Sequence, residues 1–286
     1  MRWEGRRQSE NVDDRRQLAA TPMLVGGGLM TIVIMLVLLF LGVDPQQIAA
    51  LAPDLAGPPA QRQPAGQEQA NDEMKQFVSV VLADTEDVWG KLFPNYFQGR
   101  YTPPTLVLFS GQVNSACGFA SAAAGPFYCP LDQKIYIDLA FYEELKNRFG
   151  APGDFAQAYV IAHEIGHHVQ NQLGISNKVQ AMRARVSERD YNKLSVRMEL
   201  QADFLAGVWA NHVARFAGVV DEDDIREAVN AAAAIGDDRI QKKTQGVVVP
   251  DAFTHGTSEQ RVRWFLYGLK SGDPSLMERA FEVDTP

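Results

Sequence analysis

A chain of 286 residues with 46% hydrophobic side chains is long enough to bury a full core and to form one or two domains. Its formal net charge is −8 and it has no long basic run, which argues against a nucleic-acid-binding protein; the acidic balance bears mainly on solubility. The sequence contains no internal repeat.

The N-terminal part has the pattern of a membrane anchor. An uncharged run of about 20 residues, Leu24 to Val43, is long enough to cross a bilayer, and five arginines precede it. Because basic residues stay on the cytoplasmic side, we expect a disordered cytoplasmic tail over residues 1–23, one transmembrane helix over 24–43 and an exported remainder. A cleaved signal peptide is the alternative, but the run is longer than a usual signal core, which favours a retained anchor.

A tether and a compact domain are expected after the apolar run. Residues 44–68 are rich in Pro, Gln, Ala and Gly, a composition that cannot bury a core. In residues 69–286 short strands come first and helices follow, which predicts a mostly helical α+β domain with a small sheet. In chain order we expect a helix over 74–92, a strand over 105–109, a hairpin of 127–129 with 134–138, a short helix from 139 to 145, helices over 154–172, 187–216, 221–235 and 258–270, and a connector over 241–250. Ser187 is the expected N-cap of the helix over 187–216 and Gly218 its stop, and Ser258 is the expected cap of the helix over 258–270.

The helix expected over 154–172 carries the sequence His-Glu-Ile-Gly-His. At about 100° per residue, His163 and His167 project from one helix face, and Glu164 lies beside that pair. Two neutral imidazoles in this arrangement can bind one zinc ion, and the carboxylate can reach a water on the open side of the metal. The motif therefore predicts zinc-assisted hydrolysis with Glu164 as general base; the plainer interpretation is a helix whose histidines are merely solvated.

A catalytic zinc usually has three protein ligands and a water, so a third ligand is needed. Glu199 and Asp203, in Glu-Leu-Gln-Ala-Asp, share one helix face at i and i+4. We assign Glu199 as the third ligand and Asp203 as the hydrogen-bond partner of a ligand histidine, His163 before His167. The reverse arrangement, with Asp203 on the metal and Glu199 in support, stays open at this stage, as does an ordinary solvated helix face.

Three of the five histidines lie outside the motif pair. His168 points about 100° away from His167, and His212 lies half a turn from Asp203, so neither is expected to bind the metal. His255 lies on a loop just before a helix. Such a histidine could donate a hydrogen bond to the oxyanion that forms when water attacks a carbonyl, although loop histidines are commonly surface residues.

The two cysteines, Cys117 and Cys129, are 12 positions apart. In an oxidising compartment they could close a disulfide, which agrees with an exported domain; two buried free thiols are the alternative. Two cysteines so placed make a poor zinc site by themselves.

At these residues the chain resembles the bacterial membrane-anchored neutral zinc metallopeptidases, and the resemblance extends from end to end. It rests on Met1 to Arg6, the apolar run and the tether, Cys117 and Gly118, Gly125 to Pro130, Tyr136 to Asp138, His163 to Gln170, Glu199 to Asp203, and Thr254 to Gly256 with Arg261. More distantly, the pair of helical motifs is similar to the gluzincins, which include thermolysin and the integral-membrane prenyl-protein and heat-shock metalloproteases.

The resemblance implies a zincin-like fold with one zinc ion per chain on His163, His167 and Glu199. It also implies that Asp203 lies behind a ligand histidine and that His255 aids the transition state. In gluzincins the substrate lies against an edge strand beside the metal, which here would come from residues 114–138.

Two hypotheses follow for the function. The first is a zinc endopeptidase that cuts protein or peptide substrates in the cell envelope, anchored by a single pass in the cytoplasmic membrane with its catalytic domain periplasmic or extracellular. The second is a non-proteolytic envelope module, a zinc-stabilised scaffold or partner-binding domain on a tether. The second hypothesis gives no reason for Glu164 beside an intact ligand set, so the residues favour the enzyme.

Overall fold

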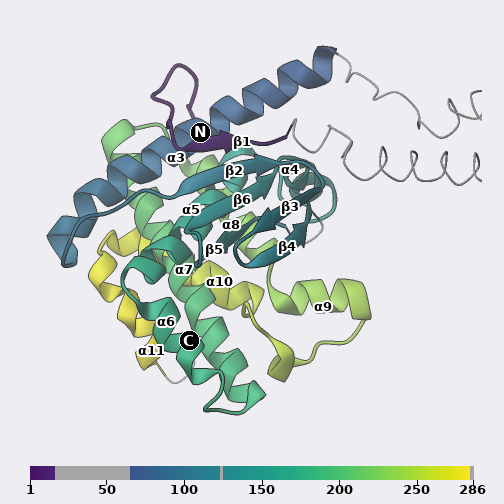
Figure 1. The fold of residues 1–286 in the computed structure, drawn as a ribbon, viewed down its shortest axis with the longest axis vertical. Helices are drawn as coiled ribbons and strands as arrows, with labels where there is room; N and C mark the ends of the chain where they lie inside the picture. Colours follow the sequence, from purple (N-terminus) through teal and green to yellow (C-terminus); the bar gives the residue numbers. More distant parts are fainter. Residues whose placement is uncertain (17–64, 123–124, 284–286) are drawn as a thin grey trace, which may run out of the picture.

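The computed structural model describes residues 1–16, 65–122 and 125–283. The anchor expected over 24–43 lies outside the described residues, as does most of the tether. Within the described ranges, the structure has no helix that is both long enough and apolar enough to span a membrane. What it does describe is the α+β domain (Figure 1).

A four-stranded sheet in the order β1-β2-β6-β5 forms one side of the domain (Figure 1). Its strands are β1 (Val12–Asp14), β2 (Thr105–Phe109), β6 (Lys134–Asp138) and β5 (Phe127–Cys129). The first three are parallel, and β5 pairs antiparallel with β6, which confirms the predicted hairpin. A second hairpin, β3 (Gln112–Ser115) with β4 (Gly118–Ser121), was not predicted.

The N-terminal segment corrects one prediction. Residues 1–16 were expected to be a disordered tail, yet they lie against the domain and contribute strand β1 to its sheet. Leu106 donates its N–H to the carbonyl of Asn11 at 2.8 Å, and Arg15 donates to the carbonyl of Leu108 at 2.8 Å. A three-residue strand with two aspartates has no alternating apolar pattern, so its pairing with buried β2 could not be seen in the sequence.

Helices make up the rest of the domain. They are α3 (Ala65–Tyr96), α4 (Ala140–Asn147), α5 (Asp154–Gln172), α6 (Ile175–Met182), α7 (Glu188–Ala217), α8 (Glu222–Ala234), α9 (Asp237–Gln245), α10 (Ser258–Ser271) and α11 (Arg279–Glu282), with 3-10 turns η2 (Pro250–Ala252) and η3 (Pro274–Glu278). The predicted bounds of α5 are confirmed, and α7 starts at its predicted cap, Ser187, and ends at Gly218. Helix α9 shows that the expected connector over 241–250 is partly helical, and Thr257, not Ser258, caps α10.

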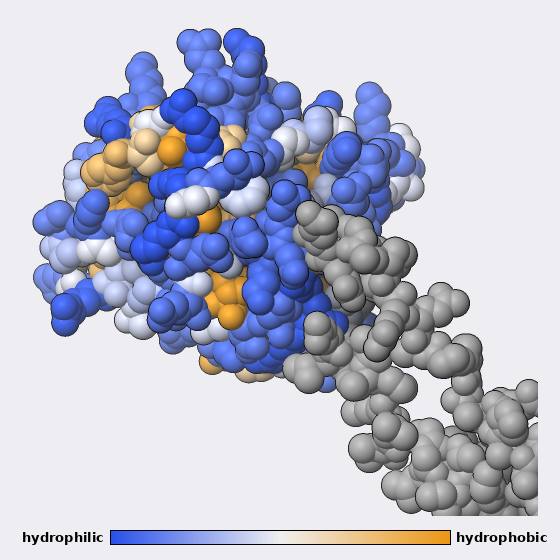
Figure 2. All heavy atoms as spheres, turned by 90° about the horizontal axis from the view of Figure 1, so that it is seen from above, coloured by the Kyte–Doolittle hydropathy of each residue, from blue (hydrophilic) through white to orange (hydrophobic). Residues whose placement is uncertain are grey.

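Close contact between helices brings α5 and α7 together at the motif. A Cβ placed on Gly166 would lie 2.9 Å from the carbonyl oxygen of Ala202, so glycine in the middle of the motif lets the two backbones approach. Helix α10 crosses α7 just as closely, since a Cβ on Gly268 would lie 1.9 Å from the carbonyl oxygen of Phe204. The face of the domain in Figure 2 is mostly hydrophilic, with apolar side chains in small separate patches.

Candidate metal centre

Three side chains from α5 and α7 converge on one point. The nitrogen and oxygen atoms that His163, His167 and Glu199 offer to a metal all lie within 4.8 Å of one another. Nε2 of His163 is 3.1 Å from Oε2 of Glu199, and Nε2 of His167 is 3.3 Å from Oε1. Tetrahedral zinc with bonds of about 2.0–2.1 Å holds its ligand atoms roughly 3.3 Å apart, so this donor set fits a zinc ion.

Each ligand-type histidine has an acceptor on its other ring nitrogen. Nδ1 of His163 lies 2.9 Å from Oδ1 of Asp203, and Nδ1 of His167 lies 2.9 Å from Oε1 of Gln170. A histidine that donates from Nδ1 keeps its Nε2 lone pair free for a metal. The structure therefore places Asp203 behind His163 and leaves Glu199 facing both Nε2 atoms.

Asp203 is held by a buried network that the sequence did not reveal in full. Arg261 from α10 donates from Nε to Oδ2 at 2.8 Å and from Nη2 to Oδ1 at 3.0 Å. The hydroxyl of Tyr159 also donates to Oδ1, at 2.5 Å. Burial opposes ionisation of Asp203, but the charges of Arg261 and His163 outweigh it and keep the pKa of Asp203 below its usual value. This carboxylate therefore stays ionised although it is fully buried.

Gln170 is a site residue that the sequence analysis missed. Its amide nitrogen donates to the carbonyl of Met198 at 2.7 Å and to Oε1 of Gln201 at 2.9 Å, which turns its carbonyl oxygen toward His167. Gln201 in turn donates to the carbonyl of Met277 at 3.0 Å. Both glutamines are completely buried. Gln170 stands three positions after His167, one helix turn on, and that spacing was the signal available in the sequence.

The charges around His163, His167 and Glu199 favour protonated imidazoles and an ionised carboxylate. Burial opposes protonation of His163, but Asp203 and Glu199 outweigh it and raise its pKa to about 9. The pKa of His167 is also raised, because Glu199 outweighs burial. Burial alone would raise the pKa of Glu199, but the charges of His167 and His163 hold it well below its usual value. A cation that binds here replaces protons on the imidazoles.

Glu164 lies in the same cavity as the three ligand-type residues. It is 7% exposed, and burial raises its pKa, although the charges of His167 and His163 oppose the rise. The cavity has a volume of about 470 Å³. Aromatic side chains from β5, α4 and the loop after α4 form part of its wall: Phe127, Tyr128, Phe141 and Phe149.

His255 also lines this cavity, from the loop before α10. Asp237 at the start of α9 holds that loop: its Oδ2 accepts the backbone N–H groups of Thr254, His255 and Gly256 at 2.7, 2.6 and 3.1 Å. Its Oδ1 lies 3.1 Å from Nδ1 of His255. This hydrogen bond raises the pKa of His255 against the effect of burial. Asp237 was not predicted from the sequence, because it is 18 positions from its partner.

The other two histidines have partners elsewhere, as expected. His168 contacts the hydroxyl of Tyr128 through Nδ1 at 3.0 Å and the carbonyl of Thr102 through Nε2 at 2.7 Å. Burial lowers its pKa to about 4, so it is neutral at physiological pH. Nε2 of His212 lies 2.8 Å from the carbonyl of Gly272. Neither residue lines the cavity that contains His163 and His167.

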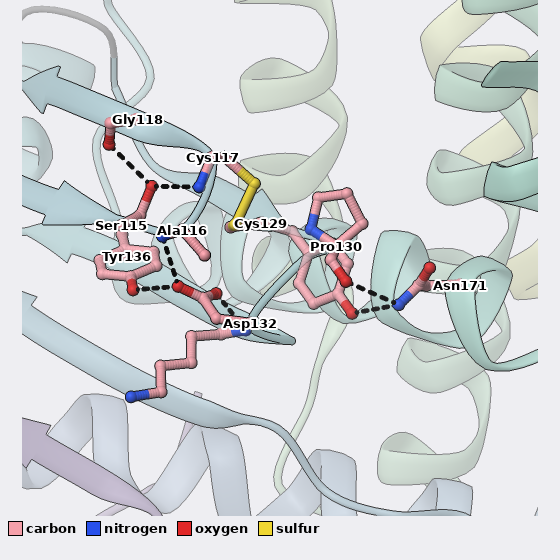
Figure 3. Close-up of a disulfide and its surroundings, with 11 residues drawn as sticks. Ser115, Ala116, Cys117, Gly118, Cys129, Pro130, Asp132, Tyr136 and Asn171 are labelled. Atoms are coloured by element: carbon pink, nitrogen blue, oxygen red, sulfur yellow. Dashed lines mark hydrogen bonds between the residues drawn. A yellow bond between two sulfur atoms is a disulfide. The ribbon is translucent and has the colours of Figure 1, made fainter.

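The structure contains the expected disulfide, between Cys117 and Cys129 (Figure 3). It joins the turn of the β3–β4 hairpin to the end of β5. Asp132 braces the same turn, because it accepts hydrogen bonds from the N–H of Ala116 at 2.9 Å and from the hydroxyl of Tyr136 at 2.7 Å (Figure 3). Asn171 on α5 donates to the hydroxyl of Tyr128 at 3.0 Å. Strand β5 is thus tied to the hairpin on one side and to the motif helix on the other.

Comparison with known proteins agrees with this geometry. The family model described as "Putative neutral zinc metallopeptidase" matches residues 1–279. The chain is 47% identical over 286 residues to "Uncharacterized protein YpfJ" of Escherichia coli K12, covering 96% of this chain and 97% of the relative. It is 39% identical over 261 residues to "Uncharacterized protein Rv2575" of Mycobacterium tuberculosis H37Rv, covering 86% of each. No solved structure matches the chain.

The family implies zinc, and a donor set that fits zinc is present in His163, His167 and Glu199. The match covers nearly the whole chain and includes the N-terminal segment as well as the motif helices. The chain therefore belongs to the neutral zinc metallopeptidase family that its sequence resembled.

Proposed function

We propose that this protein is a zinc-dependent endopeptidase that hydrolyses peptide bonds in proteins or peptides of the cell envelope. The observation that carries the proposal is the position of Glu164. It lies in one cavity with a donor set that fits zinc, and burial raises its pKa. A purely structural metal site needs its ligands but has no use for a free carboxylate beside them.

The residues around the site have distinct roles in this proposal. Zinc, when bound, supplies a Lewis acid and lowers the pKa of its water to about 7. Glu164 accepts the proton of the attacking water, and the raised pKa of this carboxyl suits a base that must later give the proton to the leaving amine. Asp203 and Gln170 hold the two imidazoles in position from behind.

His255 is placed to stabilise negative charge on the substrate. Asp237 fixes its Nδ1 side, which leaves Nε2 for the cavity. Because its pKa is raised, the ring carries a proton more readily than an ordinary histidine and can donate to an oxyanion.

Strand β5 supplies a surface for an extended substrate. It is at the end of the sheet order β1-β2-β6-β5, and its residues Phe127 and Tyr128 line the cavity. A peptide that pairs with an edge strand is held by its backbone, so its scissile bond can be presented without a fixed sequence. We propose that substrate lies along β5 beside the metal.

The disulfide supports a location outside the cytoplasm, because such bonds persist in oxidising compartments. We propose that the protein acts in the envelope and is attached to the cytoplasmic membrane through the apolar run of residues 24–43.

The test uses the zinc-loaded full-length protein and an unbiased peptide library, with cuts identified by mass spectrometry. Glu164→Gln keeps the shape of the side chain and removes the base, so we expect it to retain one zinc ion and to lose cleavage by about 10²–10⁴-fold. Cuts made equally by both proteins would refute the role of Glu164. An absence of cuts by wild-type protein that carries one zinc ion would favour the scaffold hypothesis.

A further inference from the structure

The first 16 residues pack on the peptidase domain along their whole length. The side chain of Trp3 contacts Phe77 of α3 edge to face, with ring centroids 5.7 Å apart. Strand β1 then runs parallel to β2, with Val12 opposite Leu106 and Asp14 opposite Leu108. At the other end of the segment, the amino group of Met1 lies 2.5 Å from Asp154, the first residue of the motif helix. We call residues 1–16 the N-terminal strap.

Charged contacts between the strap and α3 are specific. Both terminal nitrogens of Arg6 pair with the carboxylate of Asp84, each at 2.7 Å. Asp84 is only 6% exposed, so its charge needs a partner. Glu86 accepts hydrogen bonds from the side chains of Ser9 at 2.5 Å and Asn11 at 2.8 Å, and it also pairs with Arg7 at 3.1 Å.

These contacts decide a question of membrane sidedness. Strap and domain share one sheet and a partly buried ion pair, and two segments on opposite sides of a bilayer cannot do this. Resting on the membrane attachment proposed above, we propose that the strap and the catalytic cleft lie on the same side of the membrane. This arrangement is incompatible with the single-pass topology expected from the sequence, in which the N-terminus is a cytoplasmic tail and the domain is exported. A second copy of the chain that supplied the strap would lead to the same result, because its strap would also have to reach the side of the domain.

The arginines of the strap fit this arrangement. The positive-inside rule counts them as charges that keep the N-terminus in the cytoplasm. In the structure, however, Arg6 and Arg7 pair with carboxylates of α3, while Arg15 and Arg16 pair with Asp13 and Asp14 of the strap itself. Four of the five strap arginines are thus already paired with carboxylates of α3 or of the strap itself, and Arg2 contacts the carbonyl of Gly218.

The test maps the two segments in living cells that express the full-length protein. Gln8→Cys and Ala184→Cys each introduce one exposed thiol, the first in the strap and the second in the domain just before α7. The native cysteines are joined in a disulfide and do not react. Each variant is treated with a membrane-impermeant maleimide before and after the cells are lysed.

We expect both thiols to react to the same extent in intact cells. Reaction of both only after lysis would still support the shared side, but it would overturn the envelope location in the proposed function. Reaction of the Ala184→Cys variant in intact cells, with the Gln8→Cys variant protected until lysis, would overturn the inference and leave the proposed peptidase standing.

A double-mutant cycle tests the contact itself. Arg6→Glu is expected to lower the Tm of the detergent-purified protein, and Asp84→Arg in the same chain is expected to recover most of the loss. Arg2→Glu is the control: it makes the same change of charge in the strap, but Arg2 contacts the carbonyl of Gly218 and not Asp84. If the effects of Arg6→Glu and Asp84→Arg simply add, the strap does not dock and the inference fails.

Discussion

Gln170→Leu removes the amide that faces Nδ1 of His167, and its effect on zinc affinity can be worked out from the structure. Wild-type Gln170 makes three hydrogen bonds, to His167, Met198 and Gln201. Loss of an outer partner of a metal-binding histidine typically weakens metal affinity about 10–100-fold, which is about 1.4–2.7 kcal/mol. The lost hydrogen bonds should also destabilise the metal-free protein by about 3 kcal/mol, at about 1 kcal/mol each.

Two measurements separate these effects. Zinc affinity is measured by competition with a chelator, and the free energy of unfolding of the metal-free protein is measured in urea. Gln201→Leu is the matched control, because it removes contacts to Gln170 and to the carbonyl of Met277 but does not touch His167. We expect both variants to be less stable and Gln170→Leu to have much the weaker zinc affinity. Equal zinc affinities in wild type and Gln170→Leu would refute the positioning role.

Three further predictions concern the surroundings of the site and the strap. Asp203→Asn leaves the buried guanidinium of Arg261 without its counter-ion and should lower the free energy of unfolding, measured in urea, by about 3–5 kcal/mol. Lys193→Gln, which removes one partner of an exposed ion pair, should leave stability unchanged. Similar losses of stability in the two variants would contradict this prediction. His255→Ala should lower kcat for a library-derived peptide by about 10²–10³-fold, and Asp237→Asn by less, both with unchanged zinc affinity; a full kcat in His255→Ala would remove it from the reaction. Burial raises the pKa of Asp84 from its ordinary value of 3.8 to about 6, against the opposing charges of Arg6 and Arg7 and with a contribution from Asp87. Between pH 3.8 and about 6 the folded state therefore binds more protons at this carboxyl than the unfolded state does. The stability difference between wild type and Asp84→Asn, measured in urea, should therefore fall by about 3 kcal/mol as pH rises through that window, and a flat or rising difference would contradict it.

Local patterns in the sequence predicted the helices that carry the chemistry. Helix α7 was predicted from its cap, Ser187, to its stop, Gly218, because capping groups are local and act within one turn. The i and i+4 spacing predicted that His163 and His167 share one helix face and that Glu199 and Asp203 share another. The hairpin of β5 with β6 was predicted for the same reason, because a turn joins adjacent segments.

The missed features depend on residues that are far apart in the chain. Asp237 reaches His255 across 18 positions, and Arg261 reaches Asp203 across 58. Strand β1 pairs with β2 more than 90 positions later, and two aspartates in a three-residue strand produce no apolar alternation. Residues 241–245 of helix α9 were taken for part of a connector, because this helix is strongly polar and short and little of it faces the core.

The sequence by itself thus determined the metal-binding motif, the candidate base and the family, since each depends on residue identity and short spacing. Only the tertiary structure decided which carboxylate faces both imidazoles, what holds each imidazole from behind, and where the N-terminal strap lies. Those outcomes depend on how helices and strands pack against one another. Contacts such as Gly166 against Ala202, or Arg6 with Asp84, exist only after distant segments have come together in a single core.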